Sequence, residues 1–201
     1  MRITGGEFGG RNLKVPKSDA IRPTQDRVRE AVFNIIQFEV AGSEFLDLFA
    51  GSGAVGLEAL SRGAKSVTFV ERDRRHLAVL KENLESLGSG RVGTVAARPM
   101  ATPNDTTVIL ADAYRWVERY VGPGFSIGFA DPPYALGEEK GYASVLATLA
   151  ERGVIRPGGL FIAEMTAVQK AEETPGWELV RDRTYGKTRI CMWRRVEGLK
   201  G

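Results

Sequence analysis

The order of apolar and polar positions along the chain predicts an α/β protein. Short apolar runs, typical of strands buried on both faces of a sheet, stand at residues 45–49, 66–70, 107–111, 125–130 and 159–163. Segments between these runs carry apolar residues at helical spacing, and several of them end at a glycine: Gly63, Gly88 and Gly153. Strands that alternate with helices in this way favour an open, mostly parallel sheet.

The N-terminal part of the chain departs from this alternation. Residues 2–16 place apolar residues around two pairs of glycines, which predicts a small hairpin. Residues 24–38 have apolar positions at helical spacing, and Gly42 ends this core-facing helix. We expect Thr24 to cap the helix, because Pro23 biases the chain before it toward an extended conformation.

The C-terminal part predicts a different closing element. Residues 177–180 and 188–193 flank a Tyr-Gly turn and read as an antiparallel pair of strands. Residues 92–96 could form a strand and residues 98–105 read as a loop, and we interpret residues 91–105 as an insertion. We expect an N-terminal extension over residues 1–40, followed by one nucleotide-binding type of domain over residues 41–196.

A glycine-rich turn follows the first apolar run of the predicted sheet. Gly51, Gly53 and Gly56 stand at the spacing GxGxxG, between a predicted strand and a predicted helix. Such a turn lets a ligand approach the backbone, and the helix start offers free N–H groups. The spacing alone is weak evidence, because glycine makes up 24 of the 201 residues. A plain strand-to-helix turn explains the glycines about equally well.

Acidic residues at the strand ends favour a nucleotide site. Asp47 lies inside an apolar run, where a carboxylate is costly without a partner. Glu71 ends the second run, where a carboxylate can accept both hydroxyls of a ribose, and Asp112 follows the third. Ligands of open parallel sheets bind at this edge. A nicotinamide cofactor and S-adenosylmethionine fit these residues equally well.

Composition and charge exclude only a few classes of protein. A chain of 201 residues with 43% hydrophobic content can form one domain with a full core. The net charge of +3 is compatible with a polyanionic partner. The single cysteine, Cys191, excludes an internal disulfide and a cysteine metal cluster, and we expect it to be buried. No segment reads as a membrane span or a signal peptide, so we expect a cytoplasmic protein.

The segment Asp131-Pro-Pro-Tyr134 carries the most specific chemistry. Two prolines remove two N–H donors and stiffen the turn, which leaves backbone carbonyls free to accept hydrogen bonds from a ligand. With the Asp131 carboxylate and the flat Tyr134 ring, these acceptors suit a planar exocyclic amine. The alternative, a rigid turn with a capping aspartate, is less favoured at the end of a strand beside a glycine turn. The segment therefore predicts methyl transfer to an amino nitrogen, driven mainly by positioning and electrostatics.

These motifs lead to a family resemblance. Asp131-Pro-Pro-Tyr134 and Asp47-Leu-Phe-Ala-Gly-Ser-Gly53 resemble the S-adenosylmethionine-dependent amino-methyltransferases. Residues 2–11, 21–34 and 57–64 look like the RsmD family, whose members methylate a guanine N2 of 16S ribosomal RNA. The resemblance covers most of residues 1–165. It implies a Rossmann-like methyltransferase fold, with a mostly parallel seven-stranded sheet, helices on both faces and a closing antiparallel C-terminal hairpin.

The resemblance also implies roles for the residues at the strand ends. Gly51 and Gly53 would line the methionine end of S-adenosylmethionine, with Asp47 nearby. Glu71 would hold the ribose hydroxyls, and Asp112 would accept a hydrogen bond from the adenine amine. No metal is expected, because the methyl group of this donor is already activated.

On the substrate side, the same resemblance implies a catalytic group and an RNA-facing surface. Asp131 and Pro132 would orient the guanine amine, and Tyr134 would stack on the extruded base. The basic N-terminal part would face RNA. The expected substrate-binding residues are Arg11, Arg22, Thr24 and Arg27. The expected partner is 16S ribosomal RNA in an assembling small subunit, and the protein is expected to be a monomer with no membrane contact.

Other functions stay open on the residues alone. An amino-methyltransferase of DNA, of another RNA or of protein has the same four-residue motif, although the chain lacks a large separate recognition domain. A nicotinamide-dependent oxidoreductase fits the glycines but finds no Tyr/Lys pair or placed histidine for proton transfer. A non-catalytic RNA-binding module could use the basic residues near the C-terminus: Arg181, Arg183, Lys187, Arg189, Arg194 and Arg195.

Overall fold

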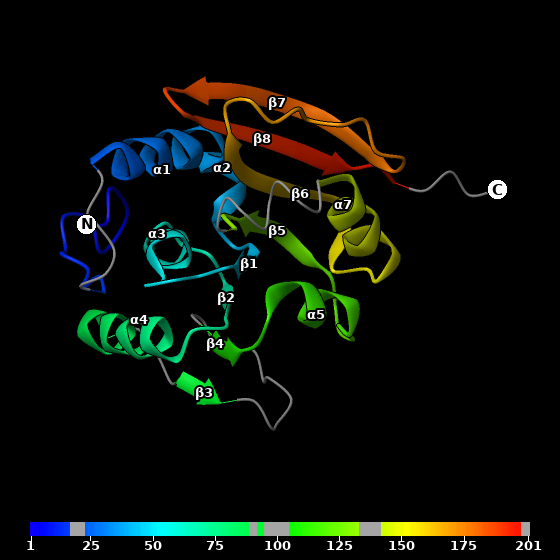
Figure 1. The fold of residues 1–201 in the computed structure, drawn as a ribbon. Coiled ribbons are helices and arrows are strands. Elements are labelled where there is room, and N and C mark those ends of the chain that lie inside the picture. Colours follow the sequence, from blue (N-terminus) through cyan, green and yellow to red (C-terminus); the bar gives the residue numbers. More distant parts are fainter. Residues whose placement is uncertain (17–22, 89–91, 95–104, 133–141, 198–201) are drawn as a thin grey trace. The chain divides into compact units, whose positions relative to one another are not determined.

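The computed structural model describes residues 1–16, 23–88, 92–94, 105–132 and 142–197 (Figure 1). By its internal contacts the chain divides into two compact units, residues 1–112 and residues 113–201. This boundary falls just after a strand of the first unit. The expected division into residues 1–40 and 41–196 stays a prediction.

Unit 1 is built on parallel strands. They are β1 (Glu44–Leu48), β2 (Ser66–Glu71), β3 (Val92–Thr94) and β4 (Asp105–Leu110), in the order β3-β4-β2-β1. The strands expected near residues 45–49, 66–70 and 107–111 are confirmed within one or two residues. The short β3 lies within residues 91–105, which the sequence predicts to be an insertion, so the described residues contain one strand more than the sheet expected from the sequence.

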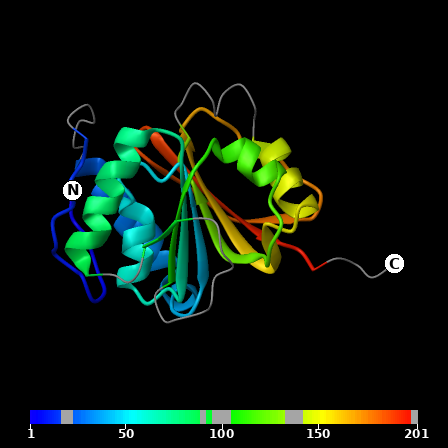
Figure 2. The ribbon, with the colours of Figure 1, turned by 90° about the horizontal axis from the view of Figure 1, so that it is seen from below.

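Four helices belong to unit 1. They are α1 (Pro23–Ile35), α2 (Gln37–Val40), α3 (Ala54–Ser61) and α4 (Arg74–Leu87). Helices α3 and α4 lie on one face of β1, β2 and β4 (Figure 2). The helix expected over residues 24–38 is interrupted at Ile36. The expected cap at Thr24 is wrong: the helix begins at Pro23, whose fixed φ and missing N–H suit a first turn, so Thr24 lies inside it.

The N-terminal segment, residues 2–16, forms the expected hairpin in reduced form. Arg2 and Asn12 make a single antiparallel bridge. Ser61, the last residue of α3, holds the turn: its carbonyl accepts the Glu7 N–H at 2.7 Å and its hydroxyl accepts the Phe8 N–H at 2.9 Å. Gly6 has φ +77°, and a Cβ there would stand 1.9 Å from the Ser61 carbonyl oxygen. Only glycine allows this approach.

Unit 2 joins a parallel pair of strands to an antiparallel hairpin. Its elements are α5 (Ala113–Glu118), β5 (Phe125–Ala130), α7 (Tyr142–Glu151), β6 (Ile155–Thr166), β7 (Trp177–Tyr185) and β8 (Thr188–Arg195). Strands β5 and β6 are parallel, whereas β8 is antiparallel to both β6 and β7. The closing hairpin predicted from the sequence is therefore confirmed (Figure 1).

The core of unit 2 contains the single cysteine. Trp193 is 1% exposed, and its ring lies 6.0 Å from the Tyr142 ring and 6.4 Å from the Phe161 ring, centroid to centroid. Cys191, two residues earlier on β8, is fully buried, and burial raises the pKa of its thiol to about 11. The expectation of a buried structural thiol is confirmed, because a thiol with a raised pKa is a poor nucleophile.

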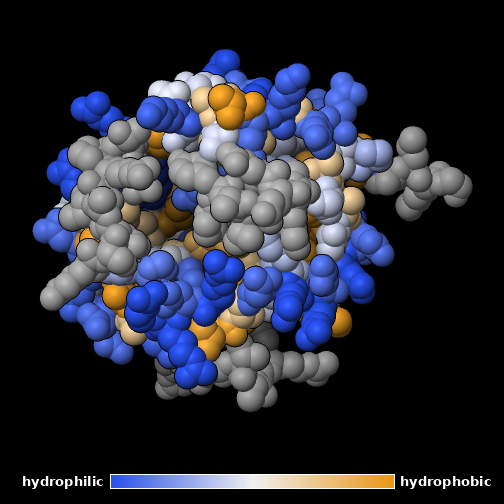
Figure 3. Space-filling view, in the orientation of Figure 1, coloured by the Kyte–Doolittle hydropathy of each residue, from blue (hydrophilic) through white to orange (hydrophobic). Residues whose placement is uncertain are grey.

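The face seen in Figure 3 is mainly polar in its described part. In the view of Figure 3, hydrophilic side chains cover most of the described part, and hydrophobic residues show only in small separate areas. Among the described residues, none of the helices has the length and apolar character that crossing a membrane requires.

A carboxylate from β1 caps the N-terminus of α3. The N-cap residue is Gly53, which has no side chain to accept a helix N–H. Asp47 takes over this role: its Oδ2 accepts the Gly56 N–H at 2.9 Å. Asp47 is 2% exposed. Burial raises the pKa of its carboxyl to about 7, the bond from Gly56 opposes this change, and the charge of Glu71 adds to it.

Two of the turn glycines are required by packing inside the protein. A Cβ on Gly56 would stand 2.2 Å from Cε1 of the Phe69 ring on β2. A Cβ on Gly53 would stand 2.2 Å from Cδ1 of Leu80 on α4. These contacts let α3 lie close against both β2 and α4. The spacing GxGxxG therefore serves helix packing as well as any ligand.

Gly56→Ala tests the close approach of α3 to β2. We expect the free energy of unfolding to fall by about 1–3 kcal/mol, because the added methyl overpacks a rigid interface. Urea denaturation of the parent and the variant measures the loss. Adding Phe69→Leu, which makes room for the methyl, should recover part of it, and a double variant no better than the sum of the single variants would contradict the proposed contact.

Asp47→Asn tests the buried carboxylate. The folded protein holds the Asp47 proton more tightly than the unfolded chain does, so this group's contribution to stability falls as pH rises from about 4 to about 7. An asparagine can still accept the Gly56 N–H but does not titrate. We expect the variant to gain on the order of 2 kcal/mol relative to the parent between pH 5 and pH 8. Denaturation at both pH values measures this, and a pH-independent difference would contradict it.

Candidate functional site

The acidic residues expected at the strand ends of unit 1 share one edge of its sheet. Glu71 is the last residue of β2 and pairs in register with Leu110, the last residue of β4, two positions before Asp112. Asp47 is the next-to-last residue of the parallel strand β1. Backbone bonds extend the ladder past the strands, from the Ala50 N–H to the Val70 carbonyl and from the Ala111 N–H to the Glu71 carbonyl, both at 3.0 Å.

Glu71 fixes the turn between β1 and α3. Its Oε2 accepts the Gly51 N–H at 2.8 Å, and its Oε1 accepts the Asp73 N–H at 2.7 Å. The side chain belongs to a residue that is 7% exposed, so both bonds lie in a largely dry environment. A carboxylate oxygen has more than one acceptor position, so Glu71 can hold this turn and still accept hydroxyls from a ligand.

The glycine turn, residues 49–53, is open on one side. Gly51 has φ +55°, and a Cβ built on it would meet no atom of the described residues within 4 Å. Its neighbour two residues earlier, Phe49, also has a positive φ, of 64°. A bulky residue in this region costs about 1–2 kcal/mol, and such strain is concentrated at functional sites. The turn thus combines an open backbone face at Gly51 with a strained entry at Phe49.

The Asp-Pro-Pro-Tyr segment begins directly after a strand of unit 2. Asp131 follows the last residue of β5 and is half-buried, and Pro132 is buried. Burial and, next, the negative charge of Asp131 raise the pKa of Tyr142, whose hydroxyl donates to the Glu164 carbonyl at 2.9 Å. Tyr134 lies outside the described residues. The catalytic roles of these residues stay predictions.

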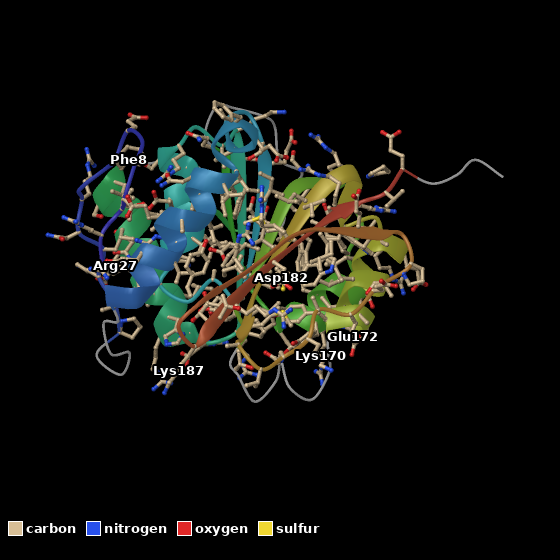
Figure 4. The ribbon with its side chains drawn as sticks, turned by 90° about the horizontal axis from the view of Figure 1, so that it is seen from above. Phe8, Arg27, Lys170, Glu172, Asp182 and Lys187 are labelled. Atoms are coloured by element: carbon tan, nitrogen blue, oxygen red, sulfur yellow. The ribbon has the colours of Figure 1, made fainter. Side chains whose placement is uncertain are left out.

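The expected substrate-binding residues of unit 1 are described only in part. Arg11 is exposed on the N-terminal segment, with its guanidinium 5.1 Å from the centre of the Phe8 ring. Arg27 is exposed on α1, near the N-terminal segment that carries Phe8 (Figure 4). Arg22 lies outside the described residues, as does the side chain of Thr24. The two described arginines therefore have the exposure that a polyanion-binding surface needs.

The basic residues near the C-terminus fall into two groups. Arg189 forms a bidentate pair with Asp182, at 2.8 and 2.5 Å, which lowers the pKa of that carboxyl. Arg194 and Arg195 donate to backbone carbonyls of Gly158 and of Ile155 and Ala150, respectively. These arginines support the hairpin. The exposed group is Arg181, Arg183 and Lys187, with Lys187 at the tip of the β7–β8 hairpin (Figure 4).

Two buried polar residues of unit 1 were missed by the sequence analysis. Glu58 is fully buried on α3, where it accepts from the Thr4 backbone and hydroxyl and pairs with Arg29 and Arg62. Asn83 is 1% exposed on α4. Their signal was present: each lies among the apolar residues of its helix, where a polar side chain requires a partner. Arg62 stands four residues after Glu58, a helical spacing that the sequence does show. The other partners of Glu58 and those of Asn83 come from other elements and could not be read from the sequence.

Comparison with known proteins places the chain in a family. The family model "Conserved hypothetical protein 95" matches residues 1–194. Ribosomal RNA small subunit methyltransferase D of Escherichia coli is 34% identical over 198 residues, which cover 97% of this chain and 90% of that protein. Both matches run through unit 1 and unit 2, so the likeness includes the strand ends and the Asp-Pro-Pro-Tyr segment alike.

Solved structures agree with the sequence match. The Escherichia coli protein yhhF has a TM-score of 0.80 and 32% identity, with 98% of each chain covered. SMU.776, solved as a complex with S-adenosylhomocysteine, has a TM-score of 0.61 and 19% identity over 87% of this chain and 50% of that one, which shows a common fold. The expected Rossmann-like methyltransferase fold is thereby confirmed. The chain belongs to the RsmD family, the family of ribosomal RNA small subunit methyltransferase D.

Proposed function

We propose that this protein transfers a methyl group from S-adenosylmethionine to the exocyclic N2 amine of a guanine in 16S ribosomal RNA. Two observations carry the proposal: Glu71 binds the Gly51 amide, and the described residues leave open space on the Cβ side of Gly51. Full-length similarity to a small-subunit ribosomal RNA methyltransferase supports the substrate class. The guanine N2 atom is inferred from the Asp-Pro-Pro-Tyr segment and the family resemblance.

The residues of unit 1 fit the cofactor. Glu71 is held by two backbone N–H groups, so its carboxylate is already oriented to accept the ribose hydroxyls. Among the residues that the structure describes, none has an atom within 4 Å of a Cβ built on Gly51, which leaves room for a ligand against the backbone. In this proposal Gly53 and Asp47 shape the turn for the methionine end, and Asp112 accepts from the adenine amine. The cofactor supplies a methyl group activated by its positively charged sulfur.

The residues after β5 act on the amine. The Asp131 carboxylate and the Pro132 carbonyl accept the two amine hydrogens, which fixes the nitrogen and makes its lone pair available for attack. Tyr134 stacks on the base. The methyl–sulfur bond of the cofactor would break as the new carbon–nitrogen bond forms, with its electron pair going to sulfur. One amine proton would leave toward the Asp131 side and pass to water. Most of the rate gain comes from orientation and from charge placed before the reaction.

The N-terminal surface of unit 1 would meet the RNA backbone. Arg11 and Arg27 are exposed, and a guanidinium pairs well with phosphate. Arg22 and Thr24 complete the proposed surface. We propose the assembling small ribosomal subunit as the natural partner, because a chain of 201 residues can use ribosomal proteins to complete a recognition surface. We also propose that the protein works as a monomer.

The first experiment is methyl transfer from labelled S-adenosylmethionine. The substrates are small ribosomal subunits from cells that lack the enzyme, the same RNA stripped of protein, and duplex DNA. Label on guanine N2 in the subunits supports the proposal, and label on the stripped RNA as well would show that assembly is unnecessary. Label only on DNA, or none with any substrate despite cofactor binding, would overturn the proposed substrate.

Glu71→Ala should weaken cofactor binding by about tenfold or more, because it removes a charge-assisted ribose contact and releases the Gly51 amide. Calorimetry with S-adenosylhomocysteine measures the dissociation constant. Asp73→Ala is the matched control: it removes a carboxylate two residues away that caps α4 through the Arg75 N–H. An unchanged dissociation constant in Glu71→Ala would remove Glu71 from the cofactor site.

Asp131→Ala should keep S-adenosylhomocysteine binding within about twofold of the parent and lose about 10²- to 10³-fold in turnover. The reason is that Asp131 is proposed to contact the amine rather than the cofactor. Single-turnover methylation of small subunits, together with calorimetry, separates the two effects. Methylation at the parent rate would rule out the proposed role of Asp131.

A further inference from the structure

One buried side chain connects the N-terminal segment to the glycine turn. Asn83 of α4 uses its amide nitrogen to donate to the Ser52 carbonyl at 2.9 Å and to the Lys14 carbonyl at 3.0 Å. Its amide oxygen accepts the Lys14 N–H at 2.8 Å. Both amide hydrogens and the oxygen are thus in use, and the opposite amide orientation would set acceptor against acceptor.

The bonds of Asn83 reach the parts of unit 1 that are proposed to bind the two substrates. Ser52 lies between Gly51, whose N–H binds Glu71, and Gly53, the N-cap of α3. Lys14 ends a stretch whose other exposed basic residues include Arg2 and Arg11. Hydrogen bonds connect Glu71 to Gly51, and Ser52 to Lys14 through Asn83, which is 1% exposed. If the Ser52 or the Lys14 backbone moves, a hydrogen bond of Asn83 is lost. A buried amide group that loses its hydrogen bond costs free energy.

We propose that Asn83 couples cofactor binding at the glycine turn to the order of the N-terminal segment and hence to RNA binding. This inference rests on the proposed function for the identity of both ligands. A cofactor that fixes Gly51 and Ser52 also fixes the carbonyl to which Asn83 donates, and so favours one arrangement of residues 13–16. By linkage, RNA held by the segment must tighten cofactor binding by the same factor.

A second anchor of the same segment provides the control. Ser61 accepts the Phe8 N–H at 2.9 Å and donates to the Gly5 carbonyl at 2.5 Å, so it holds the segment to the C-terminal end of α3. The hydrogen bonds of its hydroxyl do not include the glycine turn. Ser61→Ala therefore loosens the segment without removing the proposed connection, whereas Asn83→Ala removes the connection itself.

Hydrogen exchange with S-adenosylhomocysteine tests the coupling without RNA. The probe is the Lys14 amide, which is bonded to Asn83, with the Ile3 amide, bonded to the Arg11 carbonyl, as a second reporter. In the parent, saturating ligand should slow exchange at these amides by about fivefold or more. Ser61→Ala should keep this response from a faster baseline, and Asn83→Ala should lose it.

The outcomes separate this inference from the proposed function. If S-adenosylhomocysteine binds the parent but leaves exchange in residues 2–16 unchanged, the coupling is overturned while the cofactor assignment stands. If it does not bind, the proposed function falls, and the coupling with it. The exchange measurement on the parent tests the coupling even if Asn83→Ala does not fold. Thermal unfolding of each variant shows whether it is folded.

Binding to small ribosomal subunits tests the reciprocal effect. In the parent, the dissociation constant for subunits should fall by about fivefold when S-adenosylhomocysteine is present. In Asn83→Ala the two constants should agree within about twofold, and in Ser61→Ala the ratio should persist even if both constants rise. Equal constants with and without ligand in the parent, or loss of the ratio in Ser61→Ala alone, would contradict the role of Asn83.

Discussion

Helix α3 must have its polar ends satisfied inside the protein, and the rest of unit 1 is arranged around this requirement. The helix has eight residues, six of them buried, so protein atoms must satisfy many of the N–H and C=O groups at its ends. At its start, Asp47 reaches from β1 to the Gly56 N–H because the N-cap is a glycine. At its end, the Ser61 carbonyl accepts from the N-terminal segment. Hydrogen bonds at the two ends of α3 thus connect it to β1 and to the N-terminal segment.

The same arrangement shapes the glycine turn that is proposed to bind the cofactor. The glycine turn enters α3 through a strained Phe49, and Glu71 holds its Gly51 amide from the neighbouring strand. A carboxylate that is already bonded to two backbone N–H groups needs little reorganisation to receive a ligand. Gly53 packs closely against α4, and Gly56 packs closely against β2. Of the three glycines in the GxGxxG motif, Gly51 is the one with open space on its Cβ side among the described residues. In the proposed function, Gly53 and Gly56 therefore serve helix packing and Gly51 serves ligand access.

Buried polar side chains give the N-terminal segment its position. Glu58 and Asn83 each join elements that are distant in sequence, through bonds that a buried group cannot lose without a large cost. These bonds fix the positions of the N-terminal segment and of α1, which carry the exposed arginines. In the C-terminal hairpin, by contrast, Arg189, Arg194 and Arg195 are engaged by unit 2 itself. Positive charge alone is a poor guide to a nucleic-acid surface, because an arginine can equally serve the fold.

The sequence by itself determined the strands, the principal helices and the closing hairpin, because hydrophobic periodicity is a local property. It also located Asp47, Glu71 and Asp112 at one sheet edge, since parallel strands bring their carboxyl ends together. Tertiary structure alone decided which partners these groups have. The short strand β3, the cap that Asp47 gives to α3 and the bonds of Asn83 all depend on such partners. Each requires an atom from a distant part of the chain, and no local pattern encodes that atom's position.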